Sequence, residues 1–454
     1  MDNAGGSMEK LEDLLEPANV QVVVMMGGMG TRLKDYTCHC PKPLVDVNGK
    51  PFFAYQLQLL VSAGFKNFVF CVGHYAHMIE EYFGEGASYG IHIAYSYDGQ
   101  KLLGTGGAIR KALPYLKSDF MVVYGDSFMD IDYAEVLYRY YIGKKSGAKA
   151  LMTILKNENM LDKSNVIYQD GKIILYDKLH TVLQMNYIDY GVCIYERTLF
   201  ENYTQGCFLD VADIQNLVSV EKKLEACLVH KRFYEIGTPE SLKEFEDYAK
   251  KRFLEKRPAV FLDRDGVVNE IVFNEDTEEL ESPLKICQFS LRNRVLEALK
   301  AIKEKGYYIF VVTNQPAAAK GKTTLGKLYD INQYLLDLSV KNLCEIDGIF
   351  MCPHSEKKTA YTRETFLNKR CACRKPRTGL FQRPLETYHI DLEKSYMVGD
   401  SYTDILAGHR IGLQTVLIGD LKCDMCGRLK NNRPKIICNS LYEFSEKLPK
   451  GGAE

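Results

Sequence analysis

Two aspartates separated by one residue, Asp263 and Asp265, follow an apolar run in the stretch VFLDRDGVVNE. In an extended backbone, side chains two residues apart point the same way, so both carboxylates face one site. One aspartate can attack phosphorus and become an aspartyl-phosphate, while the other acts as general acid and then as base. We therefore interpret Asp263 as a nucleophile and Asp265 as its acid/base partner in a phosphate-transfer site.

A second candidate site lies more than two hundred residues earlier, where the run VVVMM passes into GGMGTRL. Glycines after a strand let backbone N–H groups approach phosphate oxygens, because no Cβ blocks the approach. Arg32 and Lys42 add two cations suited to a polyphosphate. The pattern lacks the third glycine of the dinucleotide fingerprint and is not a Walker loop, so on its own it also fits a plain tight turn.

Four further residues could bind a metal ion. They form a Cys-x-His pair and a Cys-x-Cys pair: Cys352, His354, Cys371 and Cys373. Their number and type match a closed tetrahedral zinc site, which leaves no coordination position for a substrate. We expect a structural Zn²⁺ that holds the loop 355–370 beside Lys375. Buried thiols with a surface histidine are the alternative.

The elements that must position these residues alternate between strand-like and helix-like segments, first over residues 21 to about 155 and again after Pro258. That alternation is typical of largely parallel sheets with helices on their faces. A charged amphipathic stretch ending at Pro258 separates the two blocks. We predict an α/β protein with a flexible leader over 1–17, one domain over 18–250 and a second over 257–454.

Size and composition narrow the functional classes. A chain of 454 residues is too long for one hydrophobic core, and its net charge of −1 gives no reason to expect nucleic acid or a membrane surface as a partner. No apolar run approaches the ~18 residues of a membrane-spanning helix, and the N-terminus lacks a signal-peptide pattern. We expect a cytoplasmic protein, and the sequence leaves a homo-oligomer open.

The first domain resembles the sugar-1-phosphate nucleotidyltransferases, especially their mannose-1-phosphate guanylyltransferase-like branch. The motifs GGMGTR, PKP and GKP are followed in order by LGTGGA, YGDS, SNV, YDK, IDYGV and YEIGTPE. The resemblance implies a Rossmann-like fold with a mixed, mostly parallel sheet. It also implies that a sugar 1-phosphate attacks the α-phosphate of a nucleoside triphosphate and releases pyrophosphate.

The same resemblance assigns roles to residues of the first domain. Arg32 and Lys42 neutralise phosphate charge, and Asp126 and Glu235 hold Mg²⁺. Much of the family has aspartate where Glu235 stands, and both side chains are hard oxygen ligands. The sugar phosphate faces Asn165, Lys178 and Asp189. The nucleotide site is formed by Gly27, Gly28, Gly30, Thr31, Gly104, Thr105, Gly106 and Gly107.

The second domain resembles the haloacid dehalogenase-like phosphatases, which implies a Rossmannoid fold. After VFLDRDGVV come VVTNQ, with Thr313 and Asn314 for the transferring phosphoryl group, and CRKP, with Arg374 for the substrate and Lys375 to balance the carboxylates. VGDSYTD supplies Asp400, with Asp404 as a further candidate. The resemblance implies that Mg²⁺ is held by Asp263, Asp400 and the backbone carbonyl of Asp265.

The four cysteine and histidine residues resemble the branch that contains histidinol-phosphate phosphatase and heptose-1,7-bisphosphate 7-phosphatase. That branch usually continues after TNQ with SGIARG, whereas this chain has PAAAKG, with Pro316 and Lys320 in the serine and arginine places. Dephosphorylation of histidinol phosphate does not give a sugar 1-phosphate, so it supplies no substrate for a sugar nucleotidyltransferase. Removal of the 7-phosphate from heptose 1,7-bisphosphate, in contrast, leaves the 1-phosphate that a nucleotidyltransferase needs.

The joint interpretation is a bifunctional enzyme, a phosphomonoesterase and a nucleotidyltransferase, of nucleotide-activated heptose biosynthesis. It dephosphorylates D-glycero-α-D-manno-heptose 1,7-bisphosphate and then transfers a nucleotidyl group to heptose 1-phosphate, with GTP favoured by the branch that the first domain resembles. One alternative is a guanylyltransferase for mannose 1-phosphate or another hexose 1-phosphate, fused to a phosphatase with a separate substrate. Another is a phosphatase with a non-catalytic nucleotide-sugar-binding regulatory domain.

Overall fold

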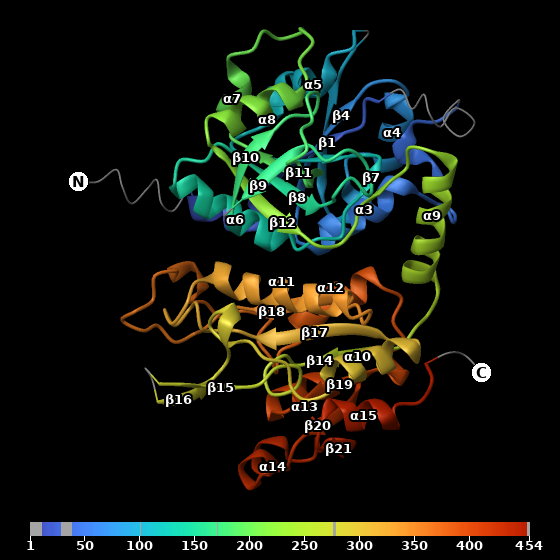
Figure 1. Ribbon diagram of the computed structural model, residues 1–454. Coiled ribbons are helices and arrows are strands. Elements are labelled where there is room, and N and C mark those ends of the chain that lie inside the picture. The colour runs from blue at the N-terminus through green and yellow to red at the C-terminus, as the bar shows by residue number, and fades with distance from the viewer. Residues whose placement is uncertain (1–10, 29–38, 100, 170, 276–277, 452–454) are drawn as a thin grey trace. The chain divides into compact units, whose positions relative to one another are not determined.

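The computed structural model describes residues 11–28, 39–99, 101–169, 171–275 and 278–451 (Figure 1). The chain divides into two compact units, Met1–Lys250 and Lys251–Glu454. Each unit has its own central sheet with helices against it, so both are α/β folds, as predicted.

The first unit is built on a nine-stranded sheet in the order β5-β4-β1-β6-β11-β8-β12-β10-β9. Its strands are β1 (Gln21–Met25), β4 (Asn67–Val72), β5 (His92–Tyr97), β6 (Phe120–Tyr124), β8 (Ala150–Lys156), β9 (Val166–Gln169), β10 (Lys172–Tyr176), β11 (Tyr187–Tyr195) and β12 (Leu224–Val229). The four strands β5, β4, β1 and β6 are parallel, whereas β11 runs antiparallel to β6 and β8. The carboxyl ends of four neighbouring strands therefore meet at one edge.

Apolar side chains on alternate faces of β1 build two cores in this unit. Val22 and Val24 pack with α3 (Phe52–Ser62), α4 (Ala76–Phe83) and α6 (Tyr133–Lys145), and Val23 packs with α5 (Gly104–Ala112) and α8 (Val211–Val220). A strand buried on both faces has to be apolar throughout, which explains the run VVVM. The unit also contains α7 (Thr198–Glu201), α9 (Pro239–Ala249) and two short ribbons. One ribbon pairs β2 (Asp46–Val47) with β3 (Lys50–Pro51), and the other pairs β7 (Ser127–Phe128) with β13 (Tyr234–Glu235).

The second unit has a six-stranded sheet in the order β18-β17-β14-β19-β20-β21, and every neighbouring pair is parallel. Its strands are β14 (Ala259–Leu262), β17 (Tyr308–Asn314), β18 (Gly348–Cys352), β19 (Tyr396–Gly399), β20 (Gln414–Ile418) and β21 (Ile436–Cys438). The chain first extends the sheet on one side of β14 and then on the other. In such sheets, ligands bind outside the carboxyl ends of the strands where the order reverses, here at β14 and β19.

Helices cover both faces of the second sheet. Val260 and Leu262 of β14 pack with α10 (Val295–Glu304), α11 (Leu325–Lys341) and α15 (Leu441–Lys447). On the opposite face, Phe261 packs with α12 (Gly379–Thr387) and α13 (Tyr402–Arg410). The short helix α14 (Cys423–Leu429) and a hairpin of β15 (Val272–Asn274) and β16 (Glu279–Glu281) complete the unit.

The second unit begins in the helical turn Lys250–Leu254. Arg252 is only 3% exposed, its Nε donates to the carbonyl of Thr387 at 3.0 Å, and its guanidinium lies 4.0 Å from the centroid of the Tyr388 ring. The carbonyl of Lys251 accepts a hydrogen bond from the Tyr308 hydroxyl at 2.6 Å. Residues just before Pro258 are therefore part of this unit's packing.

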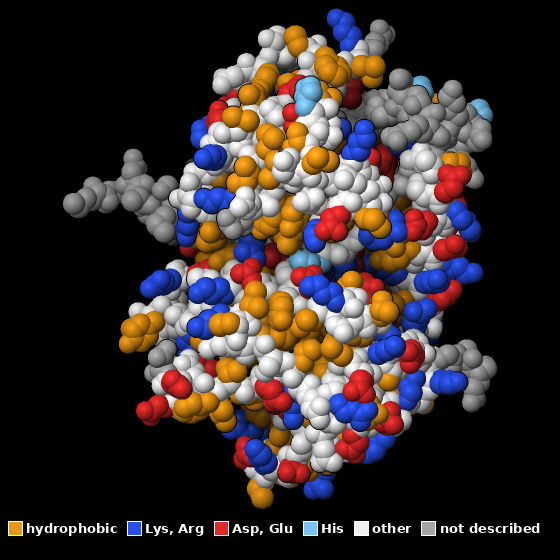
Figure 2. All heavy atoms as spheres, viewed as in Figure 1, with side chains coloured by type: hydrophobic (Ala, Val, Ile, Leu, Met, Phe, Trp, Pro, Cys, Tyr) orange, Lys and Arg blue, Asp and Glu red, His pale blue; other side chains and the backbone are white. Residues whose placement is uncertain are grey.

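The surface carries both signs of charge. On the face seen in Figure 2, acidic and basic side chains are interspersed, in keeping with the net charge of −1. Among the described residues, none of the helices is both long and apolar enough to cross a membrane.

Candidate active sites and metal centre

The predicted nucleophile Asp263 follows β14 directly, and its backbone N–H donates to the carbonyl of Val398 on β19 at 2.9 Å. The Nζ atom of Lys375 lies 2.9 Å from Asp263 Oδ1 and 2.6 Å from Asp404 Oδ1, and it donates to the Val312 carbonyl at 2.7 Å. Burial alone would lower the pKa of Lys375, but the two carboxylates outweigh burial and raise it. Lys375 is therefore a permanent cation that balances the aspartates around it.

Three carboxylates, those of Asp263, Asp400 and Asp404, lie within 4.8 Å of one another and could hold a metal ion. Asp404 is already engaged, because its Oδ1 pairs with Lys375 and its Oδ2 accepts from the Ser401 hydroxyl at 2.6 Å. Burial raises the pKa of Asp400 to about 6, with Asp404 adding to the effect. The three carboxylates are the hard oxygen ligands that a cation such as Mg²⁺ prefers.

One glycine is needed to bring Asp400 close to the strand that carries the nucleophile. Gly266 has φ +80°, and a Cβ at this position would lie 2.1 Å from Asp400 Oδ2. Both the backbone conformation and the space exclude a larger residue. The glycine in DRDG therefore has a steric role as well as a conformational one.

The predicted acid/base Asp265 accepts hydrogen bonds on both carboxylate oxygens. Oδ1 is bound by Arg264 Nη2 at 3.1 Å and Asn269 Nδ2 at 3.0 Å, and Oδ2 by the Ser282 hydroxyl at 2.9 Å and by Gln315 Nε2. Burial alone would raise the pKa of Asp265, but Arg264 and the hydrogen bonds outweigh burial and lower it. The carboxylate is held in one orientation from several sides.

These partners of Asp265 were not identified from the sequence. Asn269 and Gln315 lie within the motifs DRDGVVNE and VVTNQ, so a search for buried amides next to the aspartates could have found them. Ser282 follows the β15–β16 hairpin and carries no such signal in the sequence.

Thr313 and Asn314 end β17, which pairs with β14, so the structure brings both to the edge where Asp263 lies. The Thr313 hydroxyl accepts a hydrogen bond from Gln315 Nε2 at 2.9 Å. The side chain of Asn314 donates to the backbone carbonyl of Lys375 at 3.1 Å and accepts from its N–H at 3.0 Å. In this structure Asn314 therefore positions the segment that carries Lys375.

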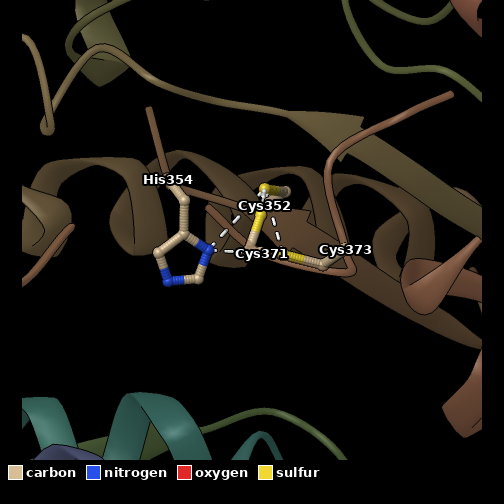
Figure 3. Close-up of side chains that lie close together, drawn as sticks. All are labelled: Cys352, His354, Cys371 and Cys373. Carbon is tan, nitrogen blue, oxygen red and sulfur yellow. Dashed lines mark hydrogen bonds between the residues drawn. The ribbon is translucent and has the colours of Figure 1, made fainter. Parts of the chain in front are cut away.

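The two cysteine and histidine pairs come together in one cluster at the end of β18 (Figure 3). Cys352 Sγ lies 3.6 Å from Cys371 Sγ and 3.1 Å from Cys373 Sγ, and His354 Nδ1 lies 3.3 Å from Cys373 Sγ. Sulfur ligands around a tetrahedral zinc ion stand about 3.8 Å apart, given Zn–S bonds of about 2.3 Å. The hydrogen bond from Cys373 lowers the pKa of Cys352, which favours a thiolate. The cluster can hold a metal ion.

The loop 355–370 between the metal-ligand pairs contacts the loop 316–324 that follows VVTNQ. The carbonyl of Ala319 accepts hydrogen bonds from the Thr362 hydroxyl at 2.8 Å and from Asn368 Nδ2 at 3.1 Å. A metal ion in the cluster would hold loop 355–370 in place, and the hydrogen bonds to Ala319 would in turn hold loop 316–324.

Cations gather beside the candidate phosphatase site. Burial lowers the pKa of Lys320, and the neighbouring charges of Arg374, Lys322 and Lys357 lower it further. Lys322 is paired with Glu281 of the hairpin at 2.6 Å. Arg374 precedes Lys375 in the chain and donates to the His354 carbonyl at 3.3 Å. Lys320, Lys357 and Arg374 thus lie close enough to one another to form a group of cations around loop 316–324.

In the first unit, Gly27 and Gly28 follow β1, while Gly30, Thr31 and Arg32 lie outside the described residues. Lys42 Nζ lies 2.9 Å from Asp126 Oδ2, just beyond the end of β6. Glu235 is on β13, whose register places it opposite Ser127. The predicted magnesium ligands Asp126 and Glu235 are thus on neighbouring backbone segments, next to one of the predicted phosphate-binding cations.

The glycines of LGTGGA lie at the start of α5 and pack tightly against the segment before α8. A Cβ on Gly104, which has φ +71°, would lie 2.5 Å from the Leu209 carbonyl oxygen. A Cβ on Gly106 would lie 2.7 Å from Leu209 Cγ, and Gly107 N donates to the Leu209 carbonyl at 3.0 Å. Thr105 donates to Asp210 Oδ1 at 3.0 Å. Close packing is therefore one reason for glycine here, and a nucleotide-binding role remains a prediction.

Two of the residues predicted to face the sugar phosphate are in direct contact. The side-chain oxygen of Asn165 accepts from the backbone N–H of Asp189 at 3.0 Å. Burial raises the pKa of Asp189 to about 6, opposed by Gly191, Gln215 and Lys178.

An open cavity of about 820 Å³ is lined by parts of 159–164, which precede Asn165 in the chain, and by parts of 181–184. Lys178 is exposed shortly before the second of these segments. None of the three predicted sugar-phosphate residues lines this cavity.

Comparison with known proteins gives a match for each unit. Residues 21–251 match the family model described as nucleotidyl transferase, and residues 372–444 match one described as HAD-hydrolase-like. The D-glycero-alpha-D-manno-heptose 1-phosphate guanylyltransferase of Campylobacter jejuni is 29% identical over 50% of this chain and 98% of its own length. The D-glycero-alpha-D-manno-heptose-1,7-bisphosphate 7-phosphatase of Photorhabdus laumondii is 36% identical over 42% of this chain and 96% of its own length.

The chain is also similar to a second phosphatase and to a solved structure. The D-glycero-beta-D-manno-heptose-1,7-bisphosphate 7-phosphatase of Vibrio cholerae is 34% identical over 36% of this chain and 81% of its own length. Among solved structures, HddC from Yersinia pseudotuberculosis complexed with GMP-PN is 24% identical and covers 50% of this chain and 99% of its own, with a TM-score of 0.42.

Proposed function

Because the chain belongs to the nucleotidyl transferase family over residues 21–251 and to the HAD-like hydrolases over its C-terminal part, we propose that it carries out two consecutive reactions on one sugar. The phosphatase removes the 7-phosphate of D-glycero-α-D-manno-heptose 1,7-bisphosphate. The transferase then joins GMP from GTP to heptose 1-phosphate and releases pyrophosphate, giving GDP-heptose.

The observation that carries this proposal is the pairing of the two relatives. The product of the 7-phosphatase that resembles the second unit is the substrate of the guanylyltransferase that resembles the first, and both relatives are named for the α anomer. A fusion of unrelated enzymes would not be expected to pair them in this way.

In the phosphatase reaction, Asp263 attacks phosphorus while the bond from phosphorus to the sugar oxygen breaks, and Asp265 gives a proton to that oxygen. Water then attacks the phosphorus of the aspartyl-phosphate while Asp265 takes up a water proton. The bond from phosphorus to the Asp263 oxygen breaks, which restores the Asp263 carboxylate and releases inorganic phosphate. Mg²⁺ at Asp263 and Asp400 would neutralise the phosphoryl oxygens. The hydrogen bonds that fix the orientation of Asp265 and the cation Lys375, 2.9 Å from Asp263, support these positions. The lowered pKa of Asp265 favours the ionised form, which is the form that takes up the water proton.

A bisphosphate substrate explains the cations around loop 316–324. Heptose 1,7-bisphosphate carries a second phosphate that is not cleaved, and the cluster of Lys320, Lys357 and Arg374 can neutralise it. Lys320 stands in the place of the arginine that is usual in this branch, so the charge of the position is kept.

In the transferase reaction, an oxygen of the sugar 1-phosphate attacks the α-phosphorus, and pyrophosphate leaves with the electrons of the broken P–O bond. Arg32 and Lys42 would neutralise the polyphosphate, and Asp126 with Glu235 would hold Mg²⁺. Asn165, Lys178 and Asp189 would face the sugar phosphate. The 2.9 Å contact between Lys42 and Asp126 supports the pairing of a phosphate-binding cation with a metal ligand.

We further propose that the domains predicted at 18–250 and 257–454 each hold one activity, the second together with the turn Lys250–Leu254 that packs on it. We also propose that the metal of the cysteine and histidine cluster is Zn²⁺. Three thiols and one imidazole are soft to borderline ligands that suit zinc better than Mg²⁺. A nucleoside triphosphate as co-substrate fits a cytoplasmic enzyme.

A substrate panel tests the proposal as a whole. We expect phosphate release from heptose 1,7-bisphosphate and pyrophosphate release from GTP with heptose 1-phosphate. We expect much weaker pyrophosphate release with mannose or glucose 1-phosphate. Preference for a hexose 1-phosphate would favour a guanylyltransferase fused to an unrelated phosphatase. Absence of pyrophosphate release with every sugar phosphate and nucleotide in the panel would leave the first unit as a binding domain.

Disrupting the metal cluster should weaken substrate binding in the phosphatase. Cys371→Ser removes one thiolate, so we expect loss of bound zinc and a KM for heptose 1,7-bisphosphate raised by about tenfold, because loop 316–324 loses its support. Hydrolysis of p-nitrophenyl phosphate, which lacks the second phosphate, should change less. Zinc content by mass spectrometry and steady-state kinetics measure both effects.

Cys423→Ser is the matched control, since Cys423 is exposed on α14 and is not one of the four clustered residues. Zinc loss from Cys371→Ser without a change in KM would show that the cluster does not act on the substrate loop.

A further inference from the structure

The proposed reaction gives no role to Ser282, the residue that follows the β15–β16 hairpin. Its hydroxyl donates to Asp265 Oδ2 at 2.9 Å, across a separation of 17 residues in the chain. The same carboxylate is bound by Arg264, Asn269 and Gln315, which lie within the motifs DRDGVVNE and VVTNQ. Ser282, in contrast, comes from outside those motifs and connects the hairpin to the proposed acid/base.

The hydroxyl of Ser282 also differs chemically from the other groups that bind Asp265. Guanidinium and amide nitrogen atoms only donate hydrogen bonds, whereas a serine hydroxyl can donate or accept. The proposed mechanism needs Asp265 as an acid in the first step and as a carboxylate in the second. By rotation of its O–H bond alone, the hydroxyl can remain bonded to either form. Ser282 can therefore hold Asp265 in one orientation through both steps.

The backbone on both sides of this serine is tied to the loop 316–324. On one side, Lys322 Nζ lies 2.6 Å from Glu281 Oε2, and the Glu281 side chain is only 12% exposed. On the other side, the Thr323 hydroxyl donates to the Leu284 carbonyl at 2.9 Å. An ion pair with a partly buried carboxylate is screened less by solvent than an exposed pair. The loop therefore fixes the segment that brings the serine to the active site.

We propose that Ser282 is a positioning residue that orients the Asp265 carboxyl toward the oxygen of the departing sugar, and that the Glu281–Lys322 ion pair holds Ser282 there. This inference rests on the proposed phosphatase function and adds a residue that orients its acid/base. It implies an effect that depends on the leaving group. A sugar oxygen needs a proton as its bond to phosphorus breaks, whereas nitrophenolate is a stable anion and leaves without one.

Ser282→Ala tests the role of the hydroxyl. We expect kcat/KM for heptose 1,7-bisphosphate to fall by about tenfold, the value of one hydrogen bond to a charged group, with the loss in kcat rather than in KM. The kcat/KM for p-nitrophenyl phosphate should stay at the wild-type value, because this ratio covers only the steps up to departure of the leaving group. Ser282→Thr keeps a hydroxyl and should recover most of the loss. Ser290→Ala, at an exposed serine of the same unit, is the matched control and should change neither substrate.

Glu281→Gln tests the ion pair that holds the hairpin. It removes the charge that pairs with Lys322, so we expect the same selective loss with heptose 1,7-bisphosphate, smaller than in Ser282→Ala. Glu279→Gln makes the same chemical change on the same hairpin. The Glu279 side chain is 67% exposed and lies 3.2 Å from Lys322, so its pair with the lysine should contribute little and both substrates should react as before.

Three results would overturn the inference. Equal losses with both substrates in Ser282→Ala would show a general structural role, and wild-type kinetics in this variant would show no role. A rise in KM for the sugar substrate alone would place Ser282 in contact with the sugar instead. Failure of the wild-type enzyme to release phosphate from heptose 1,7-bisphosphate would contradict the proposed function itself, and not the role of Ser282.

Discussion

Asp263→Asn is expected to reduce phosphate release from heptose 1,7-bisphosphate by at least about a thousandfold, because an amide cannot form the aspartyl-phosphate. Asparagine has nearly the same shape, and Lys375 keeps its contact with Asp404, so the second unit should remain folded. Pyrophosphate release from GTP and heptose 1-phosphate should stay at the wild-type rate, because it depends on residues of the other unit. Phosphate and pyrophosphate assays on the same preparation measure both activities.

Asp424→Asn makes the same chemical change at an exposed position on α14 and should leave both activities intact. If Asp263→Asn lost both activities while remaining folded, the two sites would be coupled rather than independent. Retention of phosphate release would exclude Asp263 as the nucleophile.

Lys375→Met is expected to have the largest effect on stability. It would leave the carboxylates of Asp263 and Asp404 buried without their cation, and removing one partner of a buried ion pair costs about 3–5 kcal/mol. The hydrogen bond to the Val312 carbonyl would be lost as well. Hydrogen exchange followed by mass spectrometry should show lower protection of β14 and β17, while β1 and β4 keep theirs.

Lys394→Met is the control for this change, because Lys394 is an exposed lysine of the same unit. Unchanged protection of β14 in Lys375→Met would mean that the carboxylates become protonated without cost, and that the lysine contributes little to the fold. Lys375→Met should lose phosphatase activity whether or not the protection of β14 changes, because Asp263 would no longer be held as a carboxylate.

The parts of the sites that could be predicted from the sequence depend on short-range rules. Two aspartates after an apolar strand share one face, which predicts Asp263 and Asp265 at one site. The resemblance to the haloacid dehalogenase-like phosphatases adds Thr313 and Asp400, and the ends of parallel strands bring such residues to one edge of the sheet. The paired spacing of the cysteines and histidine likewise predicted a cluster that the structure brings together.

The parts that could not be predicted depend on packing between distant segments. Ser282 contacts Asp265 only because the β15–β16 hairpin brings the chain back to the end of β14. No local sequence pattern predicts this long-range contact. Asp404 was a candidate metal ligand and does lie with Asp263 and Asp400, but its additional contacts with Lys375 and Ser401 appear only in three dimensions. The order of the strands in both sheets is likewise set by long-range pairing rather than by periodicity.

The burial of Arg252 has a consequence for separating the two enzymes. A fragment that begins at residue 257 would lack the guanidinium that lies over Tyr388 and the carbonyl of Lys251 that receives the Tyr308 hydroxyl. The Tyr308 hydroxyl and the Thr387 carbonyl would then lose the partners that these residues supply. A separately expressed phosphatase fragment should therefore begin at about residue 250. This position lies in the helical turn that the sequence alone indicates to be a linker between the domains.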